Sequence, residues 1–410
     1  MDFFTRFEQA RWEFTYGAPD APEAHNALQV GLVAYFYLDK GYSDEKRQAM
    51  AEVLARYDSE FGDKLHWGFY RNPKKKELYS KRTLQQKQVQ MLAEDGDHTD
   101  FWWASENGTT YASDYLINLV SPADWFEYIH KSVSYVKFYL PIEELKNGGE
   151  KRFMALLLAF CQRLKPMHGS AGLGIQQCYA RDKYQHLEYE IGQTFSALDI
   201  TNSNTWETGR DGIRSVNWYT FVQDSWLEKL GGIAGLRQQL DDERIALLPY
   251  EGGVMIRAGE WPELGWNKVD PYPELYVKVN QVLKPIRAPQ IYPLGYGSIA
   301  GEVRFDKTST AAWLARFDNP KPSLQEAVSV EESTLSVPEQ DVRRQFLTLP
   351  SGERCPMSGI WTTYQAGRIV RQHFAQGDIL PEWQDTATQK RAIHWTLLER
   401  DDGMSAEFPA

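Results

Sequence analysis

The run Val33-Ala34-Tyr35-Phe36-Tyr37-Leu38 recurs 102 positions later (138 minus 36) as Tyr135-Val136-Lys137-Phe138-Tyr139-Leu140. Without a gap, the same shift places His66 of LHWGFY on His168 of MHGSAGLGI. Both runs are rich in aromatic and β-branched residues, which favour strands. Each copy continues into a polar turn, a helical pattern and a second strand, so the repeat predicts a duplicated strand–helix–strand unit. A chance match of the letters FYL is the alternative.

The two expected helices run from Asp44 to Phe61 and from Gly149 to Leu164. Ser43 precedes the first helix and is a good N-cap, because its hydroxyl can accept a hydrogen bond from a free backbone N–H. An apolar stripe follows at helical spacing through Met50, Val53, Leu54 and Tyr57. Together these patterns predict an α+β fold, in which a mostly antiparallel sheet has helices on one face and is built from the duplicated unit.

Other segments extend this pattern on both sides of the second copy. Strands are expected at Ala112 to Val120, Arg214 to Val222, Ile245 to Leu248 and Gly253 to Ala258. The last two form a hairpin around Pro249-Tyr250-Glu251-Gly252. A helix from Pro273 to Leu283 follows, with proline at its first turn and Lys284-Pro285 after its end.

The composition changes between residues 319 and 341. The segment NPKPSLQEAVSVEESTLSVPEQD is rich in Pro, Ser, Glu and Val and lacks aromatic residues, which is typical of a linker. Beyond it, short strands alternate with turn signals such as Pro350-Ser351-Gly352. We therefore expect a first domain at 1–318, a linker at 319–341 and a small β-rich C-terminal module at 342–410.

The chain carries 45 Lys and Arg against 56 Asp and Glu, which gives a net charge of −11. Attraction to phosphate needs clustered basic residues, so this balance argues against direct binding of nucleic acid or of an anionic membrane. It suits a protein that meets a basic partner. Aromatic residues make up 13% of the chain, with 14 Trp and 22 Tyr, and both types are enriched at recognition surfaces.

The cysteines and apolar runs indicate the compartment. Cys161, Cys178 and Cys355 form no CxxC pair, and an odd number cannot complete a disulfide framework. The opening MDFFTRFEQARWEF is charged and lacks the apolar core of a signal peptide. The longest apolar run, Phe153 to Cys161, is far shorter than the roughly 20 residues of a membrane-spanning helix. We expect a soluble, cytoplasmic protein.

Catalytic motifs are missing from the sequence. None of the eight histidines lies in HExxH or in a Cys/His spacing typical of zinc sites, so we expect no metal. The glycine-rich run Gly169 to Gly174 lacks the order of a phosphate loop, and no GxSxG is present, so no cofactor or activated serine is expected either. His66 and His168, with nearby carboxylates, are the remaining candidates for an enzymatic cluster.

Two stretches combine acidic groups with aromatic residues. Five carboxylates occur in the thirteen residues from Glu94 to Glu106, and they cannot all be buried, because an unpaired buried charge costs several kcal/mol. The second stretch runs from Glu251 to Trp266, where Pro and Gly force a loop on two tryptophans. The candidate partner-binding residues are Glu94, Asp95, Asp97, Asp100, Trp102, Trp103 and Glu106, together with Glu251, Glu260, Trp261 and Glu263. The alternative is that core tryptophans anchor ordinary solvated loops.

Several spaced motifs resemble the type VI immunity protein family, which is encoded beside type VI secretion effectors. They are FYLD, LHWGFY, MHGSAGLGIQ, GIRSVNW (Gly212 to Trp218) and YEGGVMIRAGEWPELG (Tyr250 to Gly265), within roughly residues 20 to 290. The resemblance implies a cytoplasmic immunity protein without catalytic residues. Some members look cognate to nucleases of the VRR-Nuc type, which they neutralise by direct binding. The C-terminal SGERCPMSGIW (Ser351 to Trp361) and FAQGDILP (Phe374 to Pro381) are similar to a small module of secretion-associated toxins and immunity proteins.

The resemblance and the charge together favour one function. We expect an immunity protein that binds a toxin with a basic nuclease domain and occludes its DNA-binding or active site. The toxin is expected to be a DNase. An effector-loading chaperone or adaptor that uses the C-terminal module is the alternative, and an enzyme built on the two histidines is a third reading. The sequence sets no oligomeric state.

Overall fold

The structure is a computed structural model. It describes residues 2–17, 25–71, 75–80, 88, 92, 98–106, 108–201, 209–289, 291–295, 303–319, 344–365, 368–386, 389–391, 394–404 and 407–409. The chain divides into two compact units, Met1–Lys321 and Pro322–Ala410. The segment expected to be a linker lies, apart from Asn319, outside the described residues.

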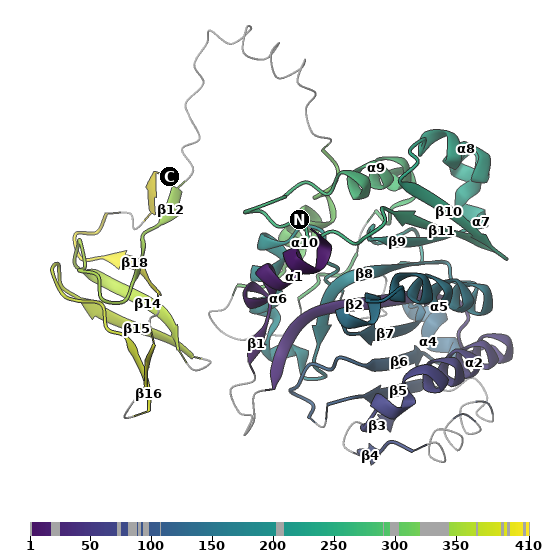
Figure 1. Ribbon diagram of the computed structural model, residues 1–410, viewed down its shortest axis with the longest axis horizontal. Helices are drawn as coiled ribbons and strands as arrows, with labels where there is room; N and C mark the ends of the chain where they lie inside the picture. Colours follow the sequence, from purple (N-terminus) through teal and green to yellow (C-terminus); the bar gives the residue numbers. More distant parts are fainter. Residues whose placement is uncertain are drawn as a thin grey trace, which may run out of the picture. The chain divides into compact units, whose positions relative to one another are not determined.

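The first unit is built on one antiparallel sheet (Figure 1). Its strands lie in the order β10-β11-β9-β8-β2-β7-β6-β5-β3-β4, and β1 pairs with β2 off this path. Their bounds are β1 Tyr16–Gly17, β2 Asn26–Leu38, β3 Trp67–Tyr70, β4 Glu77–Leu78, β5 Thr99–Ala104, β6 Leu116–Ser121, β7 Ser134–Leu140, β8 His168–Gln177, β9 Tyr219–Gln223, β10 Ile245–Tyr250 and β11 Gly253–Ala258. The two strands of the repeated motif, β2 and β7, are neighbours, with Phe36 opposite Val136.

Two long helices lie side by side over one face of this sheet, as Figure 1 shows. They are α2 (Asp44–Phe61) and α5 (Gly149–Leu164), and both have the bounds expected from the sequence. The Ser43 hydroxyl accepts a hydrogen bond from the Lys46 N–H, as its N-cap position predicts. The other helices are α1 (Phe3–Ala10), α4 (Asp124–His130), α6 (Gln185–Thr194), α7 (Asp224–Leu227), α8 (Gly232–Gln239), α9 (Glu274–Leu283) and α10 (Lys307–Leu314).

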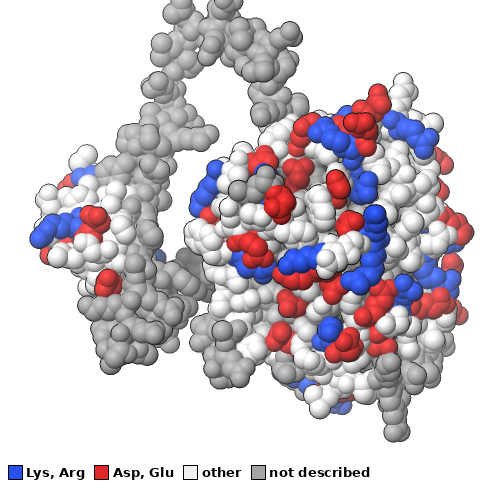
Figure 2. All heavy atoms as spheres, viewed as in Figure 1, with Lys and Arg blue, Asp and Glu red and all other residues white. Residues whose placement is uncertain are grey.

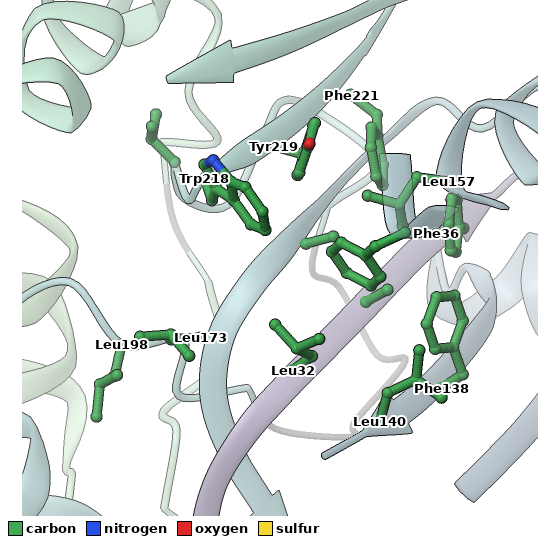
Figure 3. Close-up of a cluster of buried hydrophobic side chains, with 14 of the residues drawn as sticks. Leu32, Phe36, Phe138, Leu140, Leu157, Leu173, Leu198, Trp218, Tyr219 and Phe221 are labelled. Atoms are coloured by element: carbon green, nitrogen blue, oxygen red, sulfur yellow. The ribbon is translucent and has the colours of Figure 1, made fainter. Parts of the chain in front are cut away.

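The core lies between these helices and the sheet. Side chains alternate across a strand, so Phe36 of β2 and Phe138 of β7 point to the same face. The ring of Phe160 on α5 lies 5.7 Å from that of Phe36 and 5.4 Å from that of Phe138. Figure 3 shows Phe36 and Phe138 close to Leu157 of the same helix. Burial of these rings therefore fixes α5 on the sheet.

The opposite face of the central strands is also buried but carries polar atoms. The Tyr35 and Tyr139 hydroxyls lie 3.4 Å apart, and Arg214 Nη1 donates to the Tyr37 hydroxyl at 2.8 Å. Trp226 of the short helix α7 lies 5.7 Å from His168 on this face. Coverage of both faces explains why β2 has a continuous buried run in place of strict alternation.

The expected antiparallel α+β fold is confirmed, but the duplicated unit is not. Each copy does have a strand, a helix and a second strand. However, β8 pairs directly with β2, whereas β3 is separated from β7 by β6 and β5. The second strands therefore occupy different places in the sheet, and His66 and His168 do not have equivalent neighbours.

Two expected strands begin later than the sequence indicated. The segment 112–115 is irregular and β6 starts at Leu116, while 214–218 is irregular and β9 starts at Tyr219. In the second segment the Asn217 side chain satisfies backbone groups itself, because its Nδ2 donates to the Leu173 carbonyl at 3.1 Å and its Oδ1 accepts from the Trp218 N–H. These bonds replace the ladder that a strand would make.

The β10–β11 hairpin and helix α9 differ from the expected bounds by only one or two residues. The hairpin of β10 and β11 turns at Glu251-Gly252, so Pro249 and Tyr250 belong to β10. Gly252 has a φ of +98°, a conformation that side chains with a Cβ rarely adopt. Helix α9 begins at Glu274, with Pro273 as its N-cap residue.

The second unit is rich in β-strands, as expected. They are β12 (Arg344–Phe346), β13 (Thr348–Pro350), β14 (Gly359–Gln365), β15 (Arg368–Phe374), β16 (Trp383–Thr386), β17 (Gln389–Arg391), β18 (His394–Arg400) and β19 (Glu407–Pro409). A four-stranded sheet in the order β13-β18-β14-β15 carries a small core that includes Trp361, Trp395 and Leu397. The SGERCPMSGIW motif therefore contributes Cys355 and Trp361 to the interior.

Candidate partner-binding surfaces

The first acidic stretch leads into β5. Glu94, Asp95 and Asp97 lie outside the described residues. Asp100 is in β5, where its Oδ1 accepts a hydrogen bond from Asn118 Nδ2 at 3.2 Å. Burial raises the pKa of this carboxyl to about 6. Glu106 is half-buried and pairs with His25 at 3.2 Å.

Trp102 and Trp103 point to opposite faces of β5, and both are buried. Trp103 lies in the core under the helices, with its ring 5.0 Å from that of Tyr79. Trp102 lies on the opposite face, where Lys137 Nζ is 4.9 Å from the ring centroid. Neither ring is exposed for contact with a partner, so the reading of these residues as core tryptophans holds.

Lys137 is a basic side chain enclosed in the sheet, on the face opposite the helices. Burial, with a further effect of the nearby Arg181 charge, lowers the pKa of its ammonium to about 7. An unfolded chain would keep this group protonated up to about pH 10.4. The unfolded state therefore binds more protons than the folded state between these two values, and stability rises with pH across that window.

We expect the Lys137→Met variant to lose this rise. At most one proton is involved, so the slope removed is up to about 1.4 kcal/mol per pH unit. Urea unfolding of both proteins at a series of pH values between 7 and 10 measures it. The exposed Lys64, replaced by methionine, serves as the control. Equal slopes in the wild type and in Lys137→Met would contradict this assignment.

The second stretch surrounds β11. Glu251 forms the turn before the strand, is exposed, and pairs with Lys165 at 2.5 Å. Glu260 follows the strand and is also exposed. The ring of Trp261 is half-buried and stacks on Phe3 at 5.6 Å. Glu263 is half-buried, and burial raises the pKa of its carboxyl to about 7. The two exposed carboxylates thus lie at opposite ends of β11.

Glu260 lines a pocket of about 450 Å³. The charged residues around it come from α5, β11 and the loops beside β10 and β11: Glu150, Lys151, Glu243, Arg244, Arg257 and Glu260. The Arg244 guanidinium is already held by two carboxylates, Asp242 at 2.8 Å and Glu274 at 2.7 Å. None of the three glutamates has an ion-pair partner among the described residues. The open charges of the pocket are therefore three acidic groups against Lys151 and Arg257.

On the face drawn in Figure 2, red and blue groups are interspersed over the first unit. On this face the charged groups of the described residues thus form no single acidic patch.

The β11 pocket is built around the run GGVMIRAGEWPELG, which supplies Arg257 and Glu260. A family model, TsiV, described as type VI immunity for VRR-NUC, matches residues 49–317. The chain belongs to this family. It is thus a type VI immunity protein for a VRR-NUC effector.

A solved structure supports the fold of this TsiV-family chain. It is a Pseudomonas aeruginosa T6SS protein with a TM-score of 0.68 and 22% sequence identity, and the match covers 83% of this chain and 97% of that one. No curated protein matches the sequence. Among the described residues, no helix is long and apolar enough to cross a membrane.

The two histidines considered for an enzymatic cluster are not brought together. His66 immediately precedes β3, whereas His168 begins β8, and four strands, β2, β7, β6 and β5, separate β3 from β8 in the sheet order. His168 is buried against Tyr37, with ring centroids 4.6 Å apart, and burial lowers the pKa of its imidazole to about 3. No group of metal-ligating side chains occurs in the part of the chain that the structure describes.

Sequence reasoning identified Glu260 but missed the other acidic groups of its pocket. Glu150 lies in the first turn of α5, and Glu243 precedes β10. Each looks like an ordinary surface carboxylate in the sequence, because only the packing of α5 against β10, the partner strand of β11, brings the three together. A second surface, around α4, also escaped the sequence analysis.

Proposed function

We propose that this TsiV-family chain neutralises its VRR-NUC effector by binding it directly in the cytoplasm and covering its DNA-binding or active site. The effector is then a DNase with a basic groove. The observation that carries the proposal is the β11 pocket, in which the motif residue Glu260 meets Glu150 and Glu243.

The chemistry of the pocket suits a basic side chain. Arg244 is neutralised by Asp242 and Glu274, so it does not repel an incoming cation. The three glutamates offer acceptors for a Lys or Arg, and a guanidinium can make two parallel hydrogen bonds to a carboxylate. A DNA-binding groove is lined with such side chains, because they neutralise phosphates. Occupying them would exclude DNA from the groove.

The net charge of −11 adds a long-range effect. An acidic inhibitor approaching a basic nuclease is steered by the field of both proteins, which raises the association rate and makes it dependent on salt. The proposal therefore predicts fast association at low ionic strength and a marked decrease as salt is added.

Charge reversal at the pocket tests this directly. We expect the Glu243→Lys, Glu260→Lys double variant to bind the co-encoded effector about tenfold more weakly or worse at low salt, because rim charges that are reversed repel the basic groove. The difference should shrink at high salt. Biolayer interferometry at several salt concentrations measures both rates.

A matched control separates the pocket from net charge. Asp63 and Glu77 lie near β3 and β4, at the opposite edge of the sheet from β10 and β11, so Asp63→Lys with Glu77→Lys changes the net charge equally. Equal weakening by both pairs would assign the effect to the overall field. Unchanged affinity in the pocket variant at low salt would remove the pocket from the interface.

A further inference from the structure

The short helix α4 exposes apolar side chains and buries a charged one. Three of its large apolar side chains, Trp125, Tyr128 and Ile129, have the i, i+3, i+4 spacing of a buried apolar stripe. In the structure they are 60%, 87% and 64% exposed. Glu127, on the same helix, is buried instead. An amphipathic helix whose apolar side faces water marks a surface that another molecule covers.

The buried glutamate holds this orientation. Glu127 Oε1 accepts from the Lys40 N–H at 2.6 Å and from Arg210 Nη2 at 2.5 Å. Arg210 Nη2 also donates to the Ser132 carbonyl at 2.8 Å. If α4 rotated to bury its apolar side chains, Glu127 would leave Arg210 and the guanidinium would lose its partner, which is costly for a partly buried charge. These hydrogen bonds therefore hold α4 with its apolar stripe facing solvent.

Two hollows flank the helix. One has a volume of about 520 Å³ and reaches from Ile129 to Tyr292. The other, of about 180 Å³, lies beside Tyr128. Lys131 and Arg210 border both. The residues that dominate the binding energy of protein interfaces are often Trp, Tyr and Arg side chains beside such pockets.

The larger hollow is basic, unlike the β11 pocket. Lys131, Arg210 and Lys307 line it, against Asp211. Neither Lys131 nor Lys307 has an ion-pair partner among the described residues. The residues that line this hollow and those that line the β11 pocket do not overlap. The α4 surface and the β11 pocket are thus formed by different residues, and their unpaired charges are mainly basic in the first and mainly acidic in the second.

We propose that α4 and its two hollows form a second effector-docking surface, which takes a protein segment carrying carboxylates beside an apolar side chain. This inference rests on the proposed function for the identity of the partner. The apolar side chain enters a hollow next to Ile129, and the carboxylates meet Lys131 and Lys307. A membrane fits less well, because Asp124 and Asp211 on the same surface would repel anionic headgroups.

The test compares the wild-type chain with three variants in their affinity for the full-length co-encoded effector. In Trp125→Ala, Tyr128→Ala the apolar anchors are lost, and in Lys131→Glu, Lys307→Glu the charge is reversed. We expect each pair to weaken binding about tenfold or more, because both remove contacts at the centre of the interface. Trp12→Ala, which truncates an exposed tryptophan outside this surface, should leave the affinity unchanged. All the replaced side chains are exposed, and an unchanged melting temperature confirms folding.

The outcomes separate this inference from the proposed function. Tight effector binding that none of the α4 variants alters overturns the docking surface and leaves the proposed function intact. Failure of the wild-type chain to bind the effector overturns both. The chain is also tested for binding to phosphatidylserine–phosphatidylcholine vesicles and, by light scattering, for dimer formation. If Trp125→Ala, Tyr128→Ala abolishes vesicle binding, the surface belongs to a membrane contact. If it abolishes a dimer, the surface belongs to a second copy, and either result overturns the choice of partner.

Discussion

The Arg181→Met variant is expected to lose about 3–5 kcal/mol of unfolding free energy, because it leaves the buried carboxylate of Glu188 without its guanidinium. The two side chains are 4% and 1% exposed. Arg181 Nε donates to Glu188 Oε1 at 2.8 Å, and Nη2 donates to Glu188 Oε2 at 2.5 Å and to the Leu294 carbonyl at 2.7 Å. The pair thus joins α6 to a loop more than a hundred residues away. Urea unfolding at pH 7 measures the loss.

The double variant Arg181→Met, Glu188→Leu is the informative control. Replacing both charges by apolar groups removes the stranded carboxylate, and such replacements are often neutral or stabilising. We therefore expect the double variant to be clearly more stable than Arg181→Met alone. If the two variants are equally unstable, the loss comes from packing and not from the unpaired charge.

The Phe138→Ala variant is expected to cost about 3–5 kcal/mol, because it opens a cavity at the centre of the sheet. Phe138 is fully buried. Its ring lies 5.4 Å from that of Phe160 on α5, 5.8 Å from that of Tyr57 on α2 and 6.2 Å from that of Phe36 on β2. A single truncation therefore loosens both long helices and the central strand pair. Thermal or denaturant unfolding gives the change.

Tyr128→Ala is the matched control for this truncation, because it removes an aromatic side chain that is exposed on α4. Its effect on stability should stay within about 0.5 kcal/mol. Similar losses in both variants would mean that the sheet does not pack against α2 and α5 as described.

Local signals in the sequence predicted the helices well. Ser43 and the stripe from Met50 to Tyr57 fix α2 without information from elsewhere in the chain, and both bounds of α2 agree with the expectation. Strand order depends on distant partners. The position of β3 beyond β5 and β6 results from packing over the whole sheet, so the repeat of β2 and β7 could not reveal it.

The candidate site was predictable only in part, for related reasons. Glu260 stands out in a specific motif, but Glu150 of the same pocket comes from α5, about a hundred residues earlier in the chain, and Glu243 comes from the loop before β10. Trp103 has the same sequence signals as an exposed anchor, and burial under the helices decides otherwise. In α4 the spacing of Trp125, Tyr128 and Ile129 is visible in the sequence, yet spacing alone cannot tell whether an apolar stripe faces the core or solvent.

The central claim is that the chain stops its effector by direct binding. The most direct measurement titrates purified chain into the co-encoded VRR-NUC effector while cleavage of plasmid DNA is followed, with binding measured in parallel by calorimetry. If the chain acts by direct binding, cleavage decreases in proportion to the effector bound and stops when all of it is bound. Full cleavage in the presence of excess chain, or inhibition without detectable binding, would contradict it.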